Sequence, residues 1–337
     1  MAELNEILSS GSLEINEVPH FQGCLNIGGY NINIFSPFEF PKLDSYSYQR
    51  MGVPECNYNL ERDVEGFRVV FIHSATNLKY DWYPNQRTVV IKGNKEEFST
   101  GTCLLFAALS CAEYQRQLKG QFLFHGAAVE LPSGRSLLIL GHKGEGKTSL
   151  LYNLCRYHQC KLIANDLVYV RTEGDALAID GGTKDLNIRE SATKTYLKDL
   201  SHLFSNGVNS SWNNKRSVEP SDLEVSLSTE QSTVLESAVW IHLDPHMQEA
   251  MVKRKLNVFD RINNLHVAEL VSRHISGITT PLMNDNGEVV MLSPSFDDEV
   301  TRQNRLKMIK SMFAGGAYHI SGGNIDEITN YIFKEIV

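Results

Sequence analysis

The sequence lacks the long apolar runs of a membrane protein and the leader of a secreted one. Its apolar runs, such as the one over 137–140, are of strand length and fall far short of the roughly 20 residues that span a bilayer. The first 21 residues contain no basic segment followed by an apolar segment, so no secretory signal is visible. We therefore expect a cytoplasmic protein that does not act at a membrane.

The sequence also lacks the cysteine spacing of a zinc site or a disulfide framework, and it lacks an excess of positive charge. The six cysteines form no Cys-x-x-Cys pair and are followed by no paired histidines, so neither a zinc site nor a disulfide framework is indicated. We expect reduced thiols.

The 32 basic residues are outnumbered by 40 acidic ones, for a net charge of -8. An acidic protein is unsuited to coating nucleic acid, and we expect no nucleic-acid partner.

What is present is an ordinary globular chain of 337 residues, 42% of them hydrophobic, which is enough for two domains. Residues 1–119 contain alternating apolar runs followed by a helical pattern, and we predict a small antiparallel β-rich recognition domain there. Residues 120–337 form the second predicted domain. The expected elements of the first domain are strands at 25–35 and 66–72, a hairpin of 78–82 with 88–92, and a helix at 99–118 capped by Ser99 or Thr100.

The second domain opens with strands 121–131 and 136–140, which a tight turn joins as antiparallel neighbours. A helix over 150–157 comes next, then strands 161–164 and 167–170, separated by Asn165 and Asp166. The polar segment 200–231 is expected to be a mobile lid. The later predictions are strands at 239–243, 288–292 and 318–320, helices at 267–274, 297–312 and 325–336, and a turn at 284–287.

The segment 141–148 (GHKGEGKT) matches the Walker A pattern G-x-x-x-x-G-K-[ST]. It follows an apolar strand that ends at Leu140 and opens a helix near Lys147, which is the context that the motif requires. Its glycines allow backbone conformations closed to other residues, so loop N–H groups can converge on phosphate oxygens at a helix N-terminus. The competing interpretation is a glycine-rich turn capped by a hydroxyl group.

This loop predicts a role for each of its residues. We expect Lys147 to act as a catalytic point charge on the β- and γ-phosphates, and the Thr148 hydroxyl to bind magnesium. His142 is expected to contribute its backbone N–H rather than its ring. The residues predicted to bind the nucleotide are Gly141, His142, Lys143, Gly144, Glu145, Gly146, Lys147, Thr148 and Ser149.

Two side chains outside the loop complete the predicted site. Asp166 ends the strand 161–164 and is the expected carboxylate ligand of the bound magnesium, although a residue in this position also caps turns. His125 lies where strand 121–125 meets Gly126, across the predicted hairpin from the strand that enters the loop. It is either a catalytic histidine that meets the γ-phosphate or the acceptor, or a structural histidine.

The run from 121 to 170 resembles the kinase core of HPr kinase/phosphorylase and HPr-kinase-like proteins. His125-Gly126, the phosphate-binding loop and Asn165-Asp166 fall in order on that family's motifs. The resemblance implies an α/β (α+β) fold with a P-loop in a mixed sheet, related to the core of ATP-dependent phosphoenolpyruvate carboxykinase. It also implies phosphoryl transfer from ATP with Mg²⁺ to a hydroxyl group, with Asp166 as the catalytic or metal-linked carboxylate and His125 near the transferred phosphate.

Two residues depart from that family's pattern. Its Asp-Asp pair is Asn165-Asp166 here, and a missing general base would lower the rate by about 10²- to 10⁴-fold. The Ser-Glu that follows the loop lysine in HPr kinase/phosphorylase is Thr148-Ser149 here, so phosphorolytic activity is not assumed.

The leading hypothesis is therefore an ATP- and Mg²⁺-dependent kinase acting on a Ser/Thr hydroxyl of a peptide or protein, or on a small hydroxylated metabolite. Its alternatives are a nucleotide-binding regulatory or scaffold protein with little transfer, which Asn165 favours, and a plain NTPase. No Asn-Lys-x-Asp guanine motif is present. Basic candidates for the γ-phosphate or the acceptor are Arg189, Lys215 and Arg216, unless they are solvated surface charges. The sequence leaves open whether the protein forms a homo-oligomer.

Overall fold

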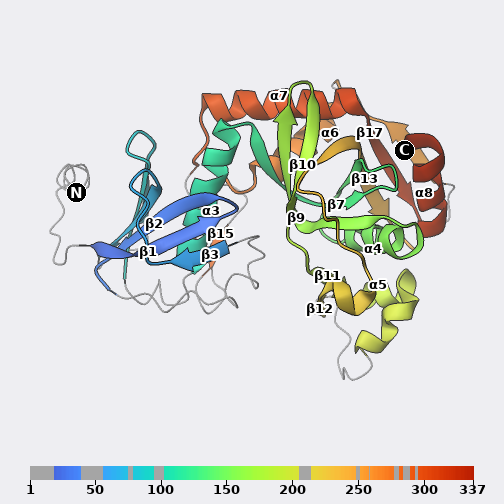
Figure 1. Cartoon of the computed structure of the whole chain (residues 1–337), viewed down its shortest axis with the longest axis horizontal. Helices are drawn as coiled ribbons and strands as arrows, with labels where there is room; N and C mark the ends of the chain where they lie inside the picture. Colours follow the sequence, from blue (N-terminus) through green and yellow to red (C-terminus); the bar gives the residue numbers. More distant parts are fainter. Residues whose placement is uncertain are drawn as a thin grey trace. The chain divides into compact units, whose positions relative to one another are not determined.

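The computed structural model describes residues 19–38, 56–74, 79–94, 102–204, 214–247, 251–257, 259–276, 281–283, 289–292 and 295–337. The chain divides into two compact units (Figure 1). Unit 1 comprises Met1–Lys119 and Ser272–Arg302, and unit 2 comprises Gly120–Val271 and Gln303–Val337. Within the described residues, no helix is both long and apolar enough to cross a membrane.

Unit 1 is built on a six-stranded sheet with the order β3-β1-β2-β4-β6-β5. The pairs β2–β4 and β4–β6 are parallel, so the predicted antiparallel sheet is wrong and the sheet is mixed. For β4 and β6 the physical reason is that β5, which lies between them in the sequence, runs antiparallel to β6 and returns the chain to the end of the sheet where β4 begins. The strands are β1 (His20–Ile27), β2 (Tyr30–Ser36), β3 (Cys56–Asn59), β4 (Phe67–His73), β5 (Lys79–Tyr83) and β6 (Thr88–Gly93).

Two local predictions in this sheet have different outcomes. The hairpin expected over 78–92 is confirmed as the antiparallel pair β5–β6. The strand expected over 25–35 is instead two antiparallel strands, β1 and β2. They are divided by Gly28 and Gly29, whose φ angles of 55° and 85° lie in the left-handed region that glycine adopts readily.

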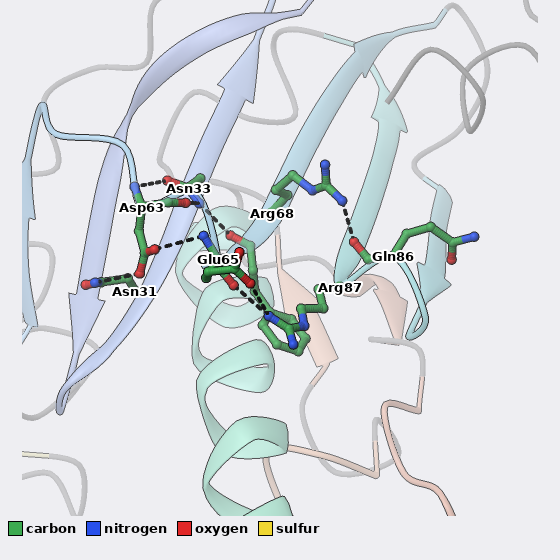
Figure 2. Close-up of polar contacts among 8 residues, drawn as sticks. Asn31, Asn33, Asp63, Glu65, Arg68, Gln86 and Arg87 are labelled. Carbon is green, nitrogen blue, oxygen red and sulfur yellow. Dashed lines mark hydrogen bonds and ion pairs between the residues drawn. The ribbon is translucent and has the colours of Figure 1, made fainter. Parts of the chain in front are cut away.

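Two asparagines of β2 fasten the segment before β4 to the sheet (Figure 2). Asn33 is 1% exposed; its amide donates to the Asp63 carbonyl at 2.7 Å, and its side-chain oxygen accepts from the Asp63 N–H at 3.0 Å. Asn31 donates to the Asp63 carboxylate at 2.9 Å. Asn33 thus satisfies both backbone polar groups of Asp63, which lies outside the strands.

The segment 272–302 belongs with unit 1, although the sequence places it inside the second domain. Phe296 packs against Trp82 at a ring-centroid distance of 4.7 Å, and the Tyr114 hydroxyl donates to Asp298 at 2.7 Å. Tyr114 lies on α3 (Thr102–Leu118), which also contacts β15 (Pro281–Met283), the partner of β16 (Val289–Leu292). The predicted helix cap at Ser99 or Thr100 and the turn at 284–287 lie outside the described residues.

Unit 2 is built on a seven-stranded mixed sheet with the order β10-β9-β7-β8-β13-β17-β14. The pairs β8–β13 and β13–β17 are parallel and the remaining neighbours are antiparallel, including the predicted β7–β8 hairpin, which is confirmed. The strands are β7 (Gln121–Glu130), β8 (Ser136–Leu140), β9 (Lys161–Glu173), β10 (Ala176–Gly182), β13 (Thr233–Leu243), β14 (Val252–Lys255) and β17 (Ala317–Gly322).

Helices cover both faces of this sheet (Figure 1). Residues of α4 (Lys147–Tyr157) and α8 (Ile325–Tyr331) pack with Ala127 and Ile139 on one face. Residues of α6 (Arg261–Ser272) and α7 (Glu299–Gly315) pack with Ala128 and Leu138 on the other. Consecutive strand residues therefore point into different cores, as the twofold period of a strand requires.

In its described part, the segment 200–231 carries regular structure that packs on the core, in place of the mobile lid that the sequence predicts. Its described portion carries β12 (Lys215–Val218), which pairs with β11 (Leu186–Arg189), and a short 3₁₀ helix, Pro220–Leu223. Val218, Leu223 and Val225 are buried in the same core as α4. Residues 205–213 lie outside the described part. The remaining elements are α5 (Glu190–Thr195), the 3₁₀ helix Lys198–Phe204 and the C-terminal π-helix Ile332–Ile336.

Candidate functional site

A glycine-rich loop joins the end of β8 to the start of α4, where the Walker A pattern predicts it. Gly146 is the N-cap of α4 with a φ of 94°. Gly141 has a φ of 152°, and a Cβ atom there would lie 2.8 Å from the Ile241 carbonyl oxygen. Glycine is required at both positions, because the backbone is left-handed and β13 approaches closely.

The Lys147 side chain folds back over this loop. It is 8% exposed, and its ammonium group donates to the carbonyl oxygens of Gly141 at 2.8 Å and His142 at 3.0 Å. The two carbonyl groups hold the charge of Lys147 in a fixed position at the loop. This is an arrangement suited to a bound anion.

Thr148 connects the loop to β9. Its hydroxyl donates to the side-chain oxygen of Asn165 at 3.2 Å, and the Asn165 amide donates to the Asp185 carbonyl at 2.9 Å. Asn165 is 1% exposed. Because the threonine proton points at Asn165, the lone pairs of the hydroxyl oxygen are turned away from it.

Asp166 sits in a left-handed turn inside one continuous strand. The sequence predicts two strands interrupted at 165–166, whereas β9 runs through this point with Asp166 at a φ of 70°. Thr183 holds the distortion: its carbonyl accepts from the Asn165 N–H at 2.7 Å, its own N–H donates to Leu167 at 3.0 Å, and its hydroxyl accepts from the Leu167 N–H at 3.0 Å. A left-handed residue is costly unless its surroundings enforce it.

The β11–β12 pair faces Asp166 with polar side chains. Asn187 donates a short hydrogen bond to one carboxylate oxygen of Asp166. Arg189 lies opposite Lys215, and both share the face of Asn187, because Asn187 and Arg189 are two residues apart on one strand. Sequence reasoning missed Asn187 and Thr183, since no pattern joins them to Asp166.

The electrostatic environment of Lys215 shows how many cations meet here. Partial burial lowers the pKa of Lys215, the Asp166 carboxylate opposes that shift, and Arg189 and Lys143 of the loop add to it. Asp166, Arg189 and Lys143 therefore each lie close enough to Lys215 to act on its charge. Arg216, the third predicted cation, points elsewhere and donates to the Leu203 carbonyl at 2.8 Å.

The remaining predicted residues lie nearby in different settings. His125 is half-buried on β7 opposite Leu167, one register position from the Gly126–Asp166 pair. Ser149 is buried in the first turn of α4. The His142 N–H, expected to face a phosphate, donates instead to the Glu145 carboxylate. The His142 ring packs against Trp240 and His266 at centroid distances of 5.1 and 4.7 Å.

Restoring a carboxylate at position 165 should destabilise the protein. Asn165 uses its oxygen for Thr148 and its amide for the Asp185 carbonyl, and an aspartate can serve only the first. In Asn165→Asp a buried carboxylate faces a carbonyl oxygen without a donor, which costs about 1–3 kcal/mol. Urea unfolding of the wild type and of the isosteric variant measures this difference, and equal midpoints would contradict it.

Comparison with known proteins yields matches among solved structures. No family model matches the chain, and no curated protein matches it. The solved structures that match include the HPr(Ser) kinase/phosphatase from Coxiella burnetii, at 12% sequence identity and a TM-score of 0.26. That match covers 40% of this chain and 77% of the other. The similarity is a distant one of fold.

Proposed function

We propose that this protein is an ATP- and Mg²⁺-dependent kinase that transfers the γ-phosphate to a hydroxyl group. The acceptor is a serine or threonine of a peptide or protein, or a small hydroxylated metabolite. The observation that carries the proposal is the bond between Thr148 and Asn165, which holds the strand bearing Asp166 against the loop bearing Lys147. A phosphate-binding loop, a hydroxyl group and a carboxylate are thereby joined in one place.

Magnesium fits the oxygen ligands that this chain offers. The Thr148 hydroxyl and the Asp166 carboxylate are the hard oxygen donors that Mg²⁺ prefers, and Mg²⁺ is commonly bound through one or two such groups together with substrate phosphates. The ion would neutralise charge on the β- and γ-phosphates when bound. Asn187 fixes one Asp166 oxygen and Asn165 fixes the direction of the Thr148 proton, so both ligands are oriented in advance.

In this proposal Lys147 binds the β- and γ-phosphates and Asp166 accepts the proton of the attacking hydroxyl or holds the metal. His125, beside Asp166 in the β7–β9 register, lies near the transferred phosphate. Lys143, Arg189 and Lys215 balance the charge of the γ-phosphate. Such transfer depends mainly on positioning and on charge stabilisation, both of which fixed side chains provide.

Lys215 lies opposite Arg189 on the β11–β12 pair, and removing its charge is expected to change the kinetics. In Lys215→Gln we expect kcat to fall about 10- to 100-fold, because one charge near the γ-phosphate is lost. The KM for ATP should change much less, since the loop itself is intact. Steady-state kinetics measure both constants. Arg216→Gln is the matched control: its side chain is adjacent in sequence but directed at Leu203, and an equal loss of kcat in this variant would contradict the assignment.

Two measurements test the proposed function. Calorimetry with Mg·ADP and Mg·ATP tests nucleotide binding, and labelled γ-phosphate tests transfer to serine- or threonine-containing peptides and to hydroxylated metabolites. Transfer of the label to a hydroxyl group supports the kinase. Tight binding without transfer to any acceptor supports instead a nucleotide-binding regulatory protein, the candidate that the replacement of a carboxylate by Asn165 favours. Unit 1 contains none of the predicted site residues and is our candidate for acceptor recognition.

A further inference from the structure

Glu145 is an unusual residue for the middle of a phosphate-binding loop, because its carboxylate has the same sign of charge as a phosphate. The structure gives this side chain a specific partner. It accepts a short hydrogen bond from the His142 N–H, three residues earlier in the same loop. The backbone closes the same span, since the Glu145 N–H donates to the His142 carbonyl at 3.3 Å. Two hydrogen bonds thus connect His142 with Glu145.

The same residue connects the loop to the end of β13. The second carboxylate oxygen of Glu145 lies 3.4 Å from Nδ1 of His242. The Glu145 carbonyl accepts from the Leu243 N–H at 3.0 Å. Glu145 is only 17% exposed in its side chain, so these contacts are sheltered. Glu145 therefore fastens the loop to the C-terminal end of β13. The His142 ring makes a second contact with this strand through Trp240 and also packs against His266.

We propose that Glu145 is a positioning residue that keeps the phosphate-binding loop in its binding shape before any nucleotide arrives, with His242 as its anchor. The inference rests on the proposed function. A loop with three glycines has much conformational freedom to lose on binding. A side chain that removes this freedom in advance raises affinity, because less ordering is left for the ligand to impose. The acceptor oxygen of Glu145, rather than its charge, performs this task.

Three variants separate the hydrogen bond from the charge. Glu145→Gln keeps an acceptor oxygen of the same reach and removes the charge, Glu145→Ala removes both, and His242→Gln weakens the anchor. Glu335→Ala, at an exposed position near the C-terminus, is the control for a lost carboxylate. Two quantities are measured in the full-length protein. They are hydrogen exchange of the 141–148 backbone without nucleotide, and the Kd for Mg·ADP.

We expect Glu145→Ala to exchange faster across the loop and to bind Mg·ADP about tenfold more weakly. Glu145→Gln should match the wild type in exchange and bind within about threefold, with His242→Gln intermediate. The inference is overturned if Glu145→Ala exchanges and binds like the wild type, or if Glu145→Gln is as impaired as Glu145→Ala. If the wild type binds no Mg·ADP, the proposed function fails, and the exchange data alone still decide whether Glu145 orders the loop.

Discussion

Replacing Lys147 with alanine is expected to lower kcat/KM for γ-phosphate transfer by about 10²- to 10³-fold. The ammonium group is buried and aimed by two loop carbonyl oxygens at 2.8 and 3.0 Å, so its charge cannot be replaced by solvent at the same position. The effect should appear in kcat as well as in KM, because negative charge shifts toward the leaving β-phosphate oxygens in the transition state, where the proposed role places Lys147.

The matched control is Lys310→Ala, which removes an exposed lysine on α7. Initial rates with labelled ATP give both constants for each variant. Thermal unfolding is recorded in parallel, since Lys147→Ala also leaves the Gly141 and His142 carbonyls without this donor. The role of Lys147 would be contradicted by a folded Lys147→Ala protein that retains more than about one tenth of wild-type kcat/KM. A loss of less than about tenfold is much smaller than the loss expected when a fixed electrostatic group is removed.

The second large effect is expected when Asp166 is replaced. The backbone conformation of this residue determines which substitutions can test it. With a φ of 70°, this residue tolerates asparagine, which visits the left-handed region readily, but penalises alanine by about 1–2 kcal/mol. Asp166→Asn also keeps an oxygen for the Asn187 amide. We therefore expect Asp166→Asn to unfold near the wild-type urea midpoint and Asp166→Ala to be less stable.

The kcat values of Asp166→Asn and Asp166→Ala should not follow the order of their stabilities. Both variants lack the carboxylate, so both should lose about 10²- to 10⁴-fold in kcat, the range of general-base assistance. Equal losses in kcat with unequal stability would assign the effect to the charge rather than to the turn. Activity in Asp166→Asn close to wild type, measured at saturating Mg²⁺ and ATP, would show that another group carries the base and metal roles.

The contiguous part of the site was predictable because its chemistry is local. The glycines, Lys147 and Thr148 fall within eight consecutive residues whose spacing suits only a strand, a loop and a helix start. The strand and helix over 136–157 and the β7–β8 hairpin followed from the same short-range rules and are confirmed. The role of each residue in nucleotide chemistry stays a prediction.

The residues that surround Asp166 were not predictable as a group. Asn187, Arg189 and Lys215 meet it only because β11 pairs with β12 and lies beside β9, and no periodicity along the chain encodes that pairing. Arg189, Lys215 and Arg216 had equal standing as sequence candidates. The alternation of side chains on β12 separated Lys215 from Arg216, which reaches the Leu203 carbonyl.

The amino-acid sequence by itself determined the glycine-rich loop over 141–148, its flanking strand and helix, and the α/β class of the second unit. Hydrophobic period and glycine conformation act over a few residues, so these features need no tertiary contact to be read. The tertiary structure alone decided the parallel pairing of β2, β4 and β6, the joining of 272–302 to unit 1, the turn at Asp166 and the partner of Glu145. Each of these depends on packing, on strand pairing or on the folded geometry of a loop, and the free energies that select them belong to contacts formed when the chain folds.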